Sequence, residues 1–151
     1  MNALDLLKDD HEKVKSIFQH ISSLSQSAER SRRSQFEKLQ QELKIHTSIE
    51  EQIFYPALET HNETKDIIKE SYKEHKQVDS LCQEIARLNP TDNKWIGKIG
   101  ELQNMVERHV RQEEGELFKR VRQIFDKQVL EDMGRRMEAA KKGEAAKIGK
   151  R

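Results

Sequence analysis

Hydrophobic residues recur along most of the chain at steps of three, four and seven positions. This spacing places side chains on one stripe of an α-helix, with polar residues on the opposite face. Four long stretches show the pattern, and a shorter one follows them. The pattern predicts helices over residues 4–24, 34–58, 64–88, 93–126 and 128–140, with a serine-rich linker over 25–34.

The connections between the four long helices are short, which favours an up-down-up-down antiparallel bundle. The clearest break is the segment 89–92, where Pro90 ends one helix and either Thr91 or Asp92 can cap the next. Prolines and glycines are few and β-branched runs are missing. We therefore predict an all-α four-helix bundle over residues 1–127. A short fifth helix and a frayed basic tail are expected over 128–151.

The two halves of the chain repeat each other at an offset of 63 to 64 residues. The apolar stripes around the repeated positions match as well, so two helix–loop–helix halves are the simplest interpretation. The repeat contains two copies of the pattern His…His-x-x-x-Glu. Its members are His11, His46 and Glu50 in the first half, and His75, His109 and Glu113 in the second.

This repeat carries the chemistry that metal ions require. Residues four apart lie on one face of a helix, so each His-x-x-x-Glu directs an imidazole and a carboxylate to the same point. Burying these groups without a cation costs free energy that a bound metal offsets. A His/Glu set without thiolate suits iron, manganese or zinc. We expect two irons, with Glu50 and Glu113 as bridging carboxylates and the four histidines as terminal ligands.

Several neighbouring residues allow two interpretations. Glu51 and Glu114 are turned about 100° from the motif glutamates, so they are either solvated or orient a ligand imidazole. Tyr55 is either a packing residue or a hydrogen-bond donor to a ligand bound at the metals. His20 and His61 lie outside the repeat and are expected at the surface. No side chain stands out as a general acid or base, so no catalytic residue is assigned.

Composition narrows the class of protein. A chain of 151 residues with a net charge of +1 fits one domain without a field that favours nucleic acid. The single Cys82 excludes an internal disulfide and fits a reducing compartment. The N-terminus lacks a secretory leader, and no apolar run is long enough to span a bilayer. We expect a cytoplasmic protein with neither a membrane nor a nucleic-acid partner.

The segments His46-Thr-Ser-Ile-Glu50-Glu51 and His109-Val-Arg-Gln-Glu113-Glu114, together with His11 and His75, resemble the hemerythrin-like family, also called the His-His-Glu cation-binding domain. The resemblance covers roughly residues 3–126. It implies a four-helix bundle around a non-haem di-iron site that all six residues ligate. Members bind dioxygen, or sense oxygen, nitric oxide, redox state or iron, and some act on peroxide. A stand-alone domain of this kind looks bacterial.

One position departs from the oxygen-carrying hemerythrins, which have a fifth histidine four residues before the third ligand histidine. Here that position is Ser71. The loss argues against reversible oxygen transport and favours chemistry with peroxide, nitric oxide or oxygen, or simple iron binding. Tyr72 is either a phenolate ligand that replaces the histidine or a packing residue.

Two functional classes follow from these observations. The first is a di-iron protein that binds, senses or reacts with dioxygen, nitric oxide or peroxide. The second is a metal-responsive interaction module without redox turnover, in which the helix over 128–140 meets a protein partner. An optical band of bridged iron distinguishes the first class, and tight binding of redox-inert zinc without reactivity distinguishes the second.

Overall fold

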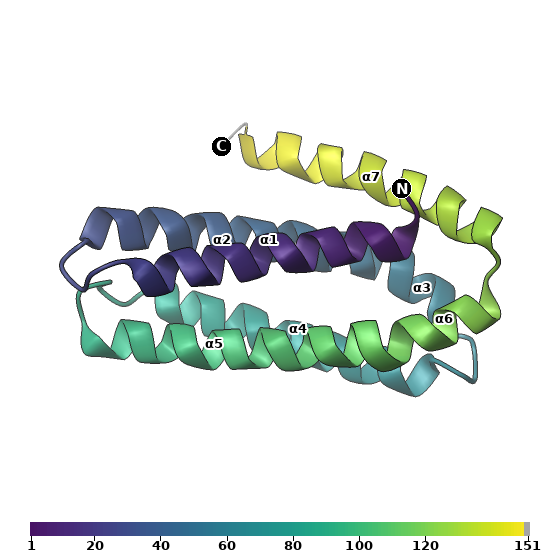
Figure 1. Cartoon of the computed structure of the whole chain (residues 1–151), viewed down its shortest axis with the longest axis horizontal. Coiled ribbons are helices and arrows are strands. Elements are labelled where there is room, and N and C mark those ends of the chain that lie inside the picture. Colours follow the sequence, from purple (N-terminus) through teal and green to yellow (C-terminus); the bar gives the residue numbers. More distant parts are fainter. Residues whose placement is uncertain (150–151) are drawn as a thin grey trace.

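The computed structural model describes residues 1–149, and the helices dominate this range (Figure 1). No strand occurs among the described residues, so the all-α prediction is confirmed. The long helices are α1 (Ala3–Ser23), α2 (Glu29–Ile49), α4 (Lys65–Ala86), α5 (Asn93–Gln112) and α7 (Lys127–Gly149). Two π-helical turns, η1 (Glu50–Phe54) and η2 (Glu113–Leu117), join α2 to α3 (Tyr55–Leu58) and α5 to α6 (Phe118–Ile124).

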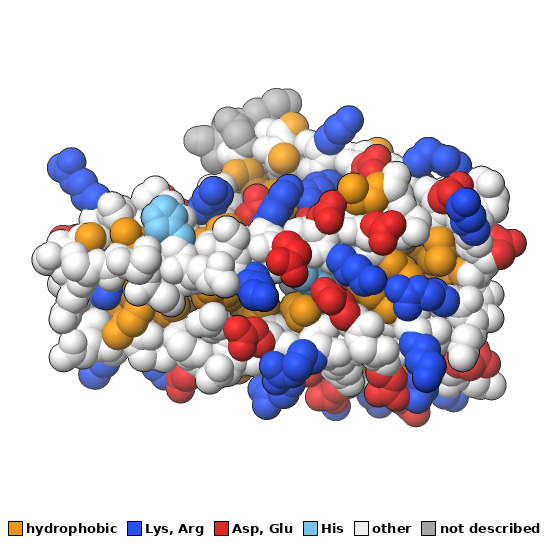
Figure 2. Space-filling model, viewed as in Figure 1, with side chains coloured by type: hydrophobic (Ala, Val, Ile, Leu, Met, Phe, Trp, Pro, Cys, Tyr) orange, Lys and Arg blue, Asp and Glu red, His pale blue; other side chains and the backbone are white. Residues whose placement is uncertain are grey.

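Helices α1, α2, α4 and α5 run alongside one another as two antiparallel hairpins (Figure 1). Helix α7 returns over the hairpin of α1 and α2 and packs against both helices. The predicted four-helix bundle with an additional helix is therefore confirmed. Acidic and basic side chains are interspersed on the face shown in Figure 2, as amphipathic helices with solvated outer faces present them. None of the helices described here has the length and apolar character needed to traverse a bilayer.

Two helix starts are fixed by local hydrogen bonds. The side chain of Asn2 accepts a hydrogen bond of 2.9 Å from the backbone N–H of Asp5 at the start of α1. At the start of α5, Asp92 accepts one of 2.9 Å from the N–H of Lys94. Asp92, and not Thr91, is thus the capping residue, because its carboxylate satisfies a helix donor that has no intrahelical partner.

The structure corrects two predicted boundaries. Helix α2 begins at Glu29, so the linker predicted over 25–34 is wrong in its second half. Arg32, expected in that linker, is buried, donates to the carbonyl of Pro90 at 2.8 Å and lies 5.3 Å from the Trp95 ring centre. The cation–π contact and the hydrogen bond give this segment tertiary partners that a local polar pattern does not reveal.

The C-terminal helix is also longer than predicted. The described part of α7 continues to Gly149, where a frayed tail was expected beyond Ala140. Leu130, Met133 and Met137 are buried and hold the helix against the rest of the molecule. The last two residues of the expected tail lie outside the described residues. The division of the chain into units at residues 127 and 128 stays a prediction.

Both His-x-x-x-Glu motifs end in a π-helical turn that the hydrophobic periodicity did not predict. In η1 the N–H of Tyr55 donates to the carbonyl of Glu50, and in η2 the N–H of Phe118 donates to that of Glu113. Each bond spans five residues, so the turn contains one residue more than an α-helical turn. The extra residue brings Tyr55 and Phe118 onto the helix face that carries the glutamates.

Two apolar clusters divide the interior along the bundle axis. One includes the start of α1, the segments after each motif and the buried face of α7. The other includes the opposite ends of the four bundle helices α1, α2, α4 and α5. In each of these four helices, the predicted ligand histidine lies between the two clusters. The site is therefore closed at both ends by hydrophobic side chains, which strengthens electrostatic interactions within it.

Gly134 on α7 packs against the backbone of the N-terminus. A Cβ atom at this position would lie 2.8 Å from the carbonyl carbon of Asn2 and 2.9 Å from the nitrogen of Ala3, and would also meet the carbonyl oxygen of Met1. Backbone atoms cannot turn aside as a flexible side chain does. We expect Gly134→Ala to reduce the free energy of unfolding by about 1–3 kcal/mol.

Gly143 on the same helix provides the matched control. Nothing lies within 4 Å of a Cβ atom added there. In a helix without such contacts, alanine is favoured over glycine, so Gly143→Ala should raise the stability by about 0.5–1 kcal/mol. Urea unfolding of both variants measures the difference. Equal effects of the two substitutions would contradict the close approach at Gly134.

Candidate metal centre

The structure brings all six residues predicted from the repeat into one buried cluster at the middle of the bundle. Each long helix of the bundle contributes a histidine, and the two π-helical turns begin with the two glutamates. The members of this site cluster are His11 on α1, His46 on α2, Glu50 in η1, His75 on α4, His109 on α5 and Glu113 in η2.

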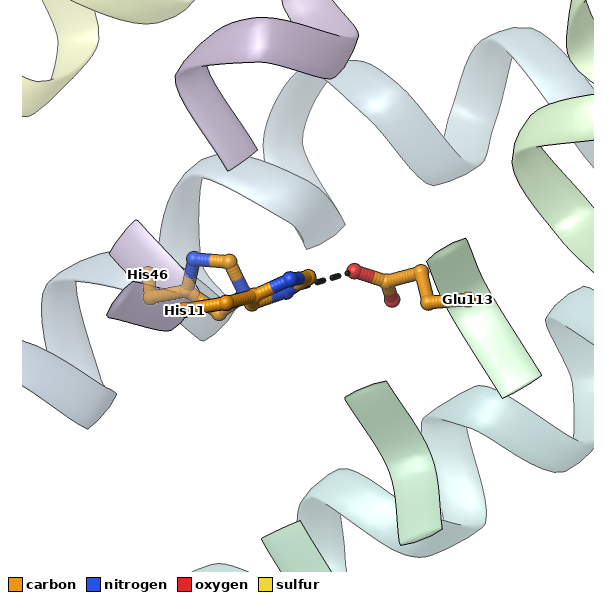
Figure 3. Close-up of side chains that lie close together, drawn as sticks. All are labelled: His11, His46 and Glu113. Carbon is orange, nitrogen blue, oxygen red and sulfur yellow. Dashed lines mark hydrogen bonds and ion pairs between the residues drawn. The ribbon is translucent and has the colours of Figure 1, made fainter. Parts of the chain in front are cut away.

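The site cluster contains two groups, each able to surround one metal ion. His11, His46 and Glu113 form one group, and Glu50, His75 and His109 form the other. Within each group the candidate ligand atoms lie within 4.8 Å of one another. Figure 3 shows the first group, in which the carboxylate of Glu113 approaches the histidine rings from the opposite side. Three nitrogen or oxygen donors per ion leave further coordination positions open.

Each glutamate lies between one histidine of each group. Glu50 Oε1 is 3.2 Å from His46 Nε2 and 3.1 Å from His75 Nε2. Glu113 places Oε1 3.1 Å from His11 Nε2 and Oε2 3.0 Å from His109 Nε2. The two carboxylates therefore connect the two groups, which is the arrangement that a carboxylate bridge between two ions requires.

Buried polar atoms in the site cluster lack hydrogen-bond partners. They are Nε2 of His46 and both carboxylate oxygens of Glu50. An unsatisfied buried acceptor loses its hydration without compensation, which typically costs about 1–3 kcal/mol and more for a charged group. A cation that accepts these lone pairs removes the penalty. The donor set of the site cluster thus fits a metal pair.

A ring of four acidic residues surrounds the histidines; we call them the outer carboxylates. Each accepts a hydrogen bond from the Nδ1 atom of one histidine, at 2.5 to 2.9 Å. Because a carboxylate only accepts, Nδ1 of each histidine donates to it, and Nε2 faces the centre of the site, where it can bind a metal when it carries no proton. The pairs are Glu114 with His11, Asp10 with His46, Glu51 with His75 and Glu74 with His109.

The outer carboxylates decide between the two interpretations of Glu51 and Glu114, and they include two residues that the sequence analysis did not single out. Glu51 and Glu114 orient imidazoles in the structure, which was one of their two interpretations. Asp10 and Glu74 were not identified from the sequence. They directly precede His11 and His75 and repeat at the same offset of 64, so an acidic residue before the first histidine of each half was the available signal.

The outer carboxylates should contribute to metal affinity without touching the metal. Glu74→Gln keeps the shape of the side chain but replaces its charged acceptor beside His109 Nδ1 with a neutral amide. We expect metal affinity to fall by about 10–100-fold, the usual effect of removing such a partner. Competition with a chelator measures the change. The control Glu70→Gln, an exposed residue one turn earlier on α4, should leave the affinity unchanged, and equal affinities for both variants would contradict this role.

The buried carboxylates strongly affect the histidine protonation. Burial by itself disfavours the charged imidazole of His46, but attraction to Glu50 and the hydrogen bond with Asp10 outweigh it and raise its pKa to about 10. The pKa of His109 is likewise raised well above its ordinary value, against the effect of burial, mainly by Glu113. The same interactions, opposed by burial, keep the pKa of Glu113 well below its usual range.

Metal binding should therefore release protons. At neutral pH, protonated His46 and His109 balance the charges of Glu50 and Glu113 in the metal-free site. A metal needs the neutral imidazoles, and the pKa of His75 is raised as well, so we expect release of two or more protons per chain, with affinity that rises with pH towards about 10. Calorimetric titration at pH 7.5 in buffers with different ionisation enthalpies measures the number. A heat that is independent of the buffer would contradict the raised histidine pKa values.

Tyr55 is the additional polar side chain in contact with the centre of the site cluster. It is fully buried, and its hydroxyl donates to Glu113 Oε2 at 3.0 Å. The hydroxyl oxygen of Tyr55 also lies 3.1 Å from His75 Nε2 and 3.4 Å from His109 Nε2. Burial and the two site carboxylates raise its pKa well above the usual value, so the phenol keeps its proton. The hydroxyl can donate to a ligand bound at the second group.

A buried serine occupies the position of the missing fifth histidine. The hydroxyl of Ser71 donates to the carbonyl of Ile67 at 2.9 Å. Ser71 also acts to lower the pKa of Tyr55, against the larger effects that raise it. Tyr72 directs its hydroxyl outward to Glu59, at 3.3 Å, so the phenol at the site is that of Tyr55. In the second half of the repeat, Phe118 occupies the position that matches Tyr55; it stacks on His11 of the first group, with ring centres 6.4 Å apart.

A groove of about 750 Å³ leads from the surface to the second group. His75 and Glu51 line it at the site, and Lys44, Thr47 and Lys76 line it farther out. The lining mixes polar side chains with Leu43, Val78 and Cys82, and it brings small molecules to the imidazole of His75. The histidines outside the repeat belong to neither group: His20 is exposed, and the ring of His61 packs edge-to-face against Phe125 near Glu63.

Comparison with known proteins gives two relatives along nearly the whole chain. A crystal structure of a Hemerythrin HHE cation binding domain-containing protein from Mycobacterium kansasii superposes with a TM-score of 0.86 at 25% identity, covering 97% of this chain and 89% of the other. A DNA nickase from Nostoc sp. is 27% identical over 150 residues, which are 99% of this chain. The chain spans only 42% of the length of that relative.

The family comparison agrees with the geometry of the site. The model of the Hemerythrin HHE cation binding domain matches residues 2–121, a range that includes the complete site cluster and all four outer carboxylates. The structural neighbour carries the same domain name. The resemblance noted from the two motifs is confirmed, and the chain belongs to the Hemerythrin HHE cation binding domain family.

Proposed function

We propose that the chain is a non-haem di-iron protein that binds or reacts with dioxygen, nitric oxide or peroxide at a carboxylate-bridged site. Its ligands are the six residues of the site cluster. The observation that carries this proposal is the position of Glu50 and Glu113, each within 3.2 Å of histidines from both groups. Zinc or manganese fits the same donors, but zinc has no redox chemistry.

Each part of the site has a role in this function. Bound iron supplies open coordination positions and redox activity. The outer carboxylates fix the histidine rings with Nε2 towards the centre, and the apolar clusters exclude bulk water. Tyr55 offers a hydrogen-bond donor beside the second group, and the groove next to His75 gives small molecules access. No side chain is assigned as a catalytic residue.

Metal analysis combined with visible absorption tests this function. Protein from iron-supplemented cells should contain about two irons per chain, which is the number of ligand groups. Addition of oxygen, nitric oxide or peroxide should change a charge-transfer band. Zinc-substituted protein serves as the control and should remain colourless. Iron content near zero, or a bound iron pair whose spectrum responds to none of the three, would overturn the proposal.

One contact favours a second function, that of a metal-responsive interaction module. Lys141 on α7 pairs with Asp10, which in turn holds His46. A metal that fixes His46 also fixes this chain of contacts, so α7 could present its outer face to a protein partner only in the metal-bound form. Tight zinc binding that protects α7 from hydrogen exchange, without any reaction of the iron form, would favour this function over the first.

The expectation that nucleic acid is not a partner stays a prediction. The DNA nickase name belongs to a relative of which this chain spans less than half. The formal net charge of the present chain is +1. Tight non-specific DNA binding relies on the neutralisation of several phosphates by basic side chains.

A further inference from the structure

We propose that Tyr55 and Tyr72 form an electron-transfer path between the site cluster and the protein surface. This inference rests on the proposed function, with hydrogen peroxide as the ligand. It assigns the path by which reducing equivalents enter, which the six ligands themselves do not define. The chain contains only these two tyrosines, and the structure places one at the site and the other between the site and solvent.

The two rings are in direct contact. Their centres lie 5.3 Å apart with an interplanar angle of 76°, which is an edge-to-face packing. Tyr55 is fully buried with its hydroxyl at the second group, whereas Tyr72 is partly exposed on α4. An electron can therefore pass from the surface to the site through a single contact between oxidisable side chains.

The two hydroxyls point to different surroundings. That of Tyr55 lies at the second group, 3.1 Å from His75 Nε2, and that of Tyr72 donates to Glu59 at 3.3 Å. A phenol that loses an electron becomes strongly acidic, so a nearby acceptor allows the proton to move with the electron. Glu59 is exposed, so the proton of Tyr72 can exchange with solvent.

Alternative paths lack suitable side chains. Besides Tyr72, the rings in contact with Tyr55 are the site histidine His75 and Phe54, and the phenyl ring is much harder to oxidise than a phenol. The single tryptophan, Trp95, lies in the apolar cluster on the other side of the site. At the equivalent positions of the repeat, Phe118 corresponds to Tyr55 and Lys8 corresponds to Tyr72. The tyrosine pair is therefore found beside the second group only.

The electron balance of the reaction is simple. Hydrogen peroxide takes up two electrons and two protons and becomes two water molecules. For each electron delivered, Tyr55 gives its electron and its hydroxyl proton to the peroxide and becomes a phenoxyl radical. Tyr72 then reduces Tyr55, which regains a proton from water in the groove, and the proton of Tyr72 moves to Glu59. A one-electron reductant of the ascorbate class restores Tyr72, which regains its proton.

Rapid freeze-quench electron paramagnetic resonance of iron-loaded protein mixed with hydrogen peroxide tests the path. The wild type should show a tyrosyl radical and, because Tyr72 is accessible, dityrosine fluorescence from cross-linked molecules. In Tyr72→Phe the radical should remain on Tyr55, and ascorbate should remove it about tenfold more slowly, equivalent to about 1.4 kcal/mol of activation free energy. Tyr72→Trp, which restores an oxidisable ring, should recover most of the rate.

Tyr55→Phe separates the path from direct oxidation of the surface. Dityrosine should disappear in this variant, because oxidation can no longer leave the site. If Tyr55→Phe forms as much dityrosine as the wild type, Tyr72 is oxidised from solution and the path is wrong. If peroxide is consumed without any radical that depends on either tyrosine, the path also fails, while the proposed function stands.

A second measurement covers the case in which peroxide is not consumed. Ferrous protein is exposed to a photogenerated one-electron oxidant that is too large to enter the groove, such as ruthenium tris-bipyridine with persulfate. The path predicts that Tyr72→Phe and Tyr55→Phe both oxidise iron more slowly than the wild type. Unchanged rates would overturn the path. Protein that takes up no iron would overturn the proposed function and this inference together, and metal analysis identifies that case.

Discussion

Replacing Glu113 with glutamine will weaken metal binding by more than about 100-fold, beyond the effect typical of a residue that only orients a ligand. Glu113 is buried, ionised and located between His11 and His109. Glutamine has nearly the same volume, so packing is retained. It lacks the negative charge, and its amide nitrogen cannot ligate a metal, so one group of the site loses a donor and the connection between the two groups is lost.

The measurement is the metal content after dialysis against a weak chelator, supported by the thermal stability of the variant. Glu116→Gln is the matched control, since Glu116 lies in the same π-helical turn but is exposed and pairs with Arg120. It should retain wild-type metal content. Full metal content in Glu113→Gln would show that Glu113 is not a bridging ligand and would leave the two groups without their proposed connection.

Removal of the metal will lower the melting temperature strongly. A metal present at 1,000 times its dissociation constant adds about 4 kcal/mol of stability. In a domain of about 150 residues each kcal/mol corresponds to about 2–4 °C, so we expect a difference of roughly 8–16 °C.

Differential scanning calorimetry of metal-bound and chelator-treated protein measures this difference. The Glu113→Gln variant provides the control, because addition of metal should change its melting temperature very little. A chelator that leaves the wild-type melting temperature unchanged would mean that the site cluster is stable as a network of hydrogen bonds and ion pairs alone. The hydrogen bonds between the outer carboxylates and the histidines would then be the interactions that hold the metal-free site together.

Much of the site could be predicted because its chemistry repeats. The offsets between His11 and His75, and between Glu50 and Glu113, relate positions that local propensity alone does not connect. The helical period then placed these residues on the buried face, and the structure brings all six together. The same logic extends to Asp10 and Glu74, whose repeat at an equal offset was available in the sequence but was not used.

Other features depended on contacts between distant segments. The start of α2 could not be located, because Arg32 is buried through its contacts with Pro90 and Trp95, which follow almost 60 residues later. The length of α7 depends on the burial of its apolar face against the rest of the molecule. A short amphipathic pattern does not contain this information, since tertiary burial provides most of the stability of a helix.

The sequence by itself determined the helical class, the two-fold repeat and the identity of the six residues in the site cluster. Periodicity and residue chemistry are local properties, and a repeat relates them across the chain. The tertiary structure alone decided that Tyr55 and not Tyr72 reaches the site, because a π-helical turn adds one residue after Glu50. It also decided which carboxylate holds each histidine, since that pairing depends on how the helices pack.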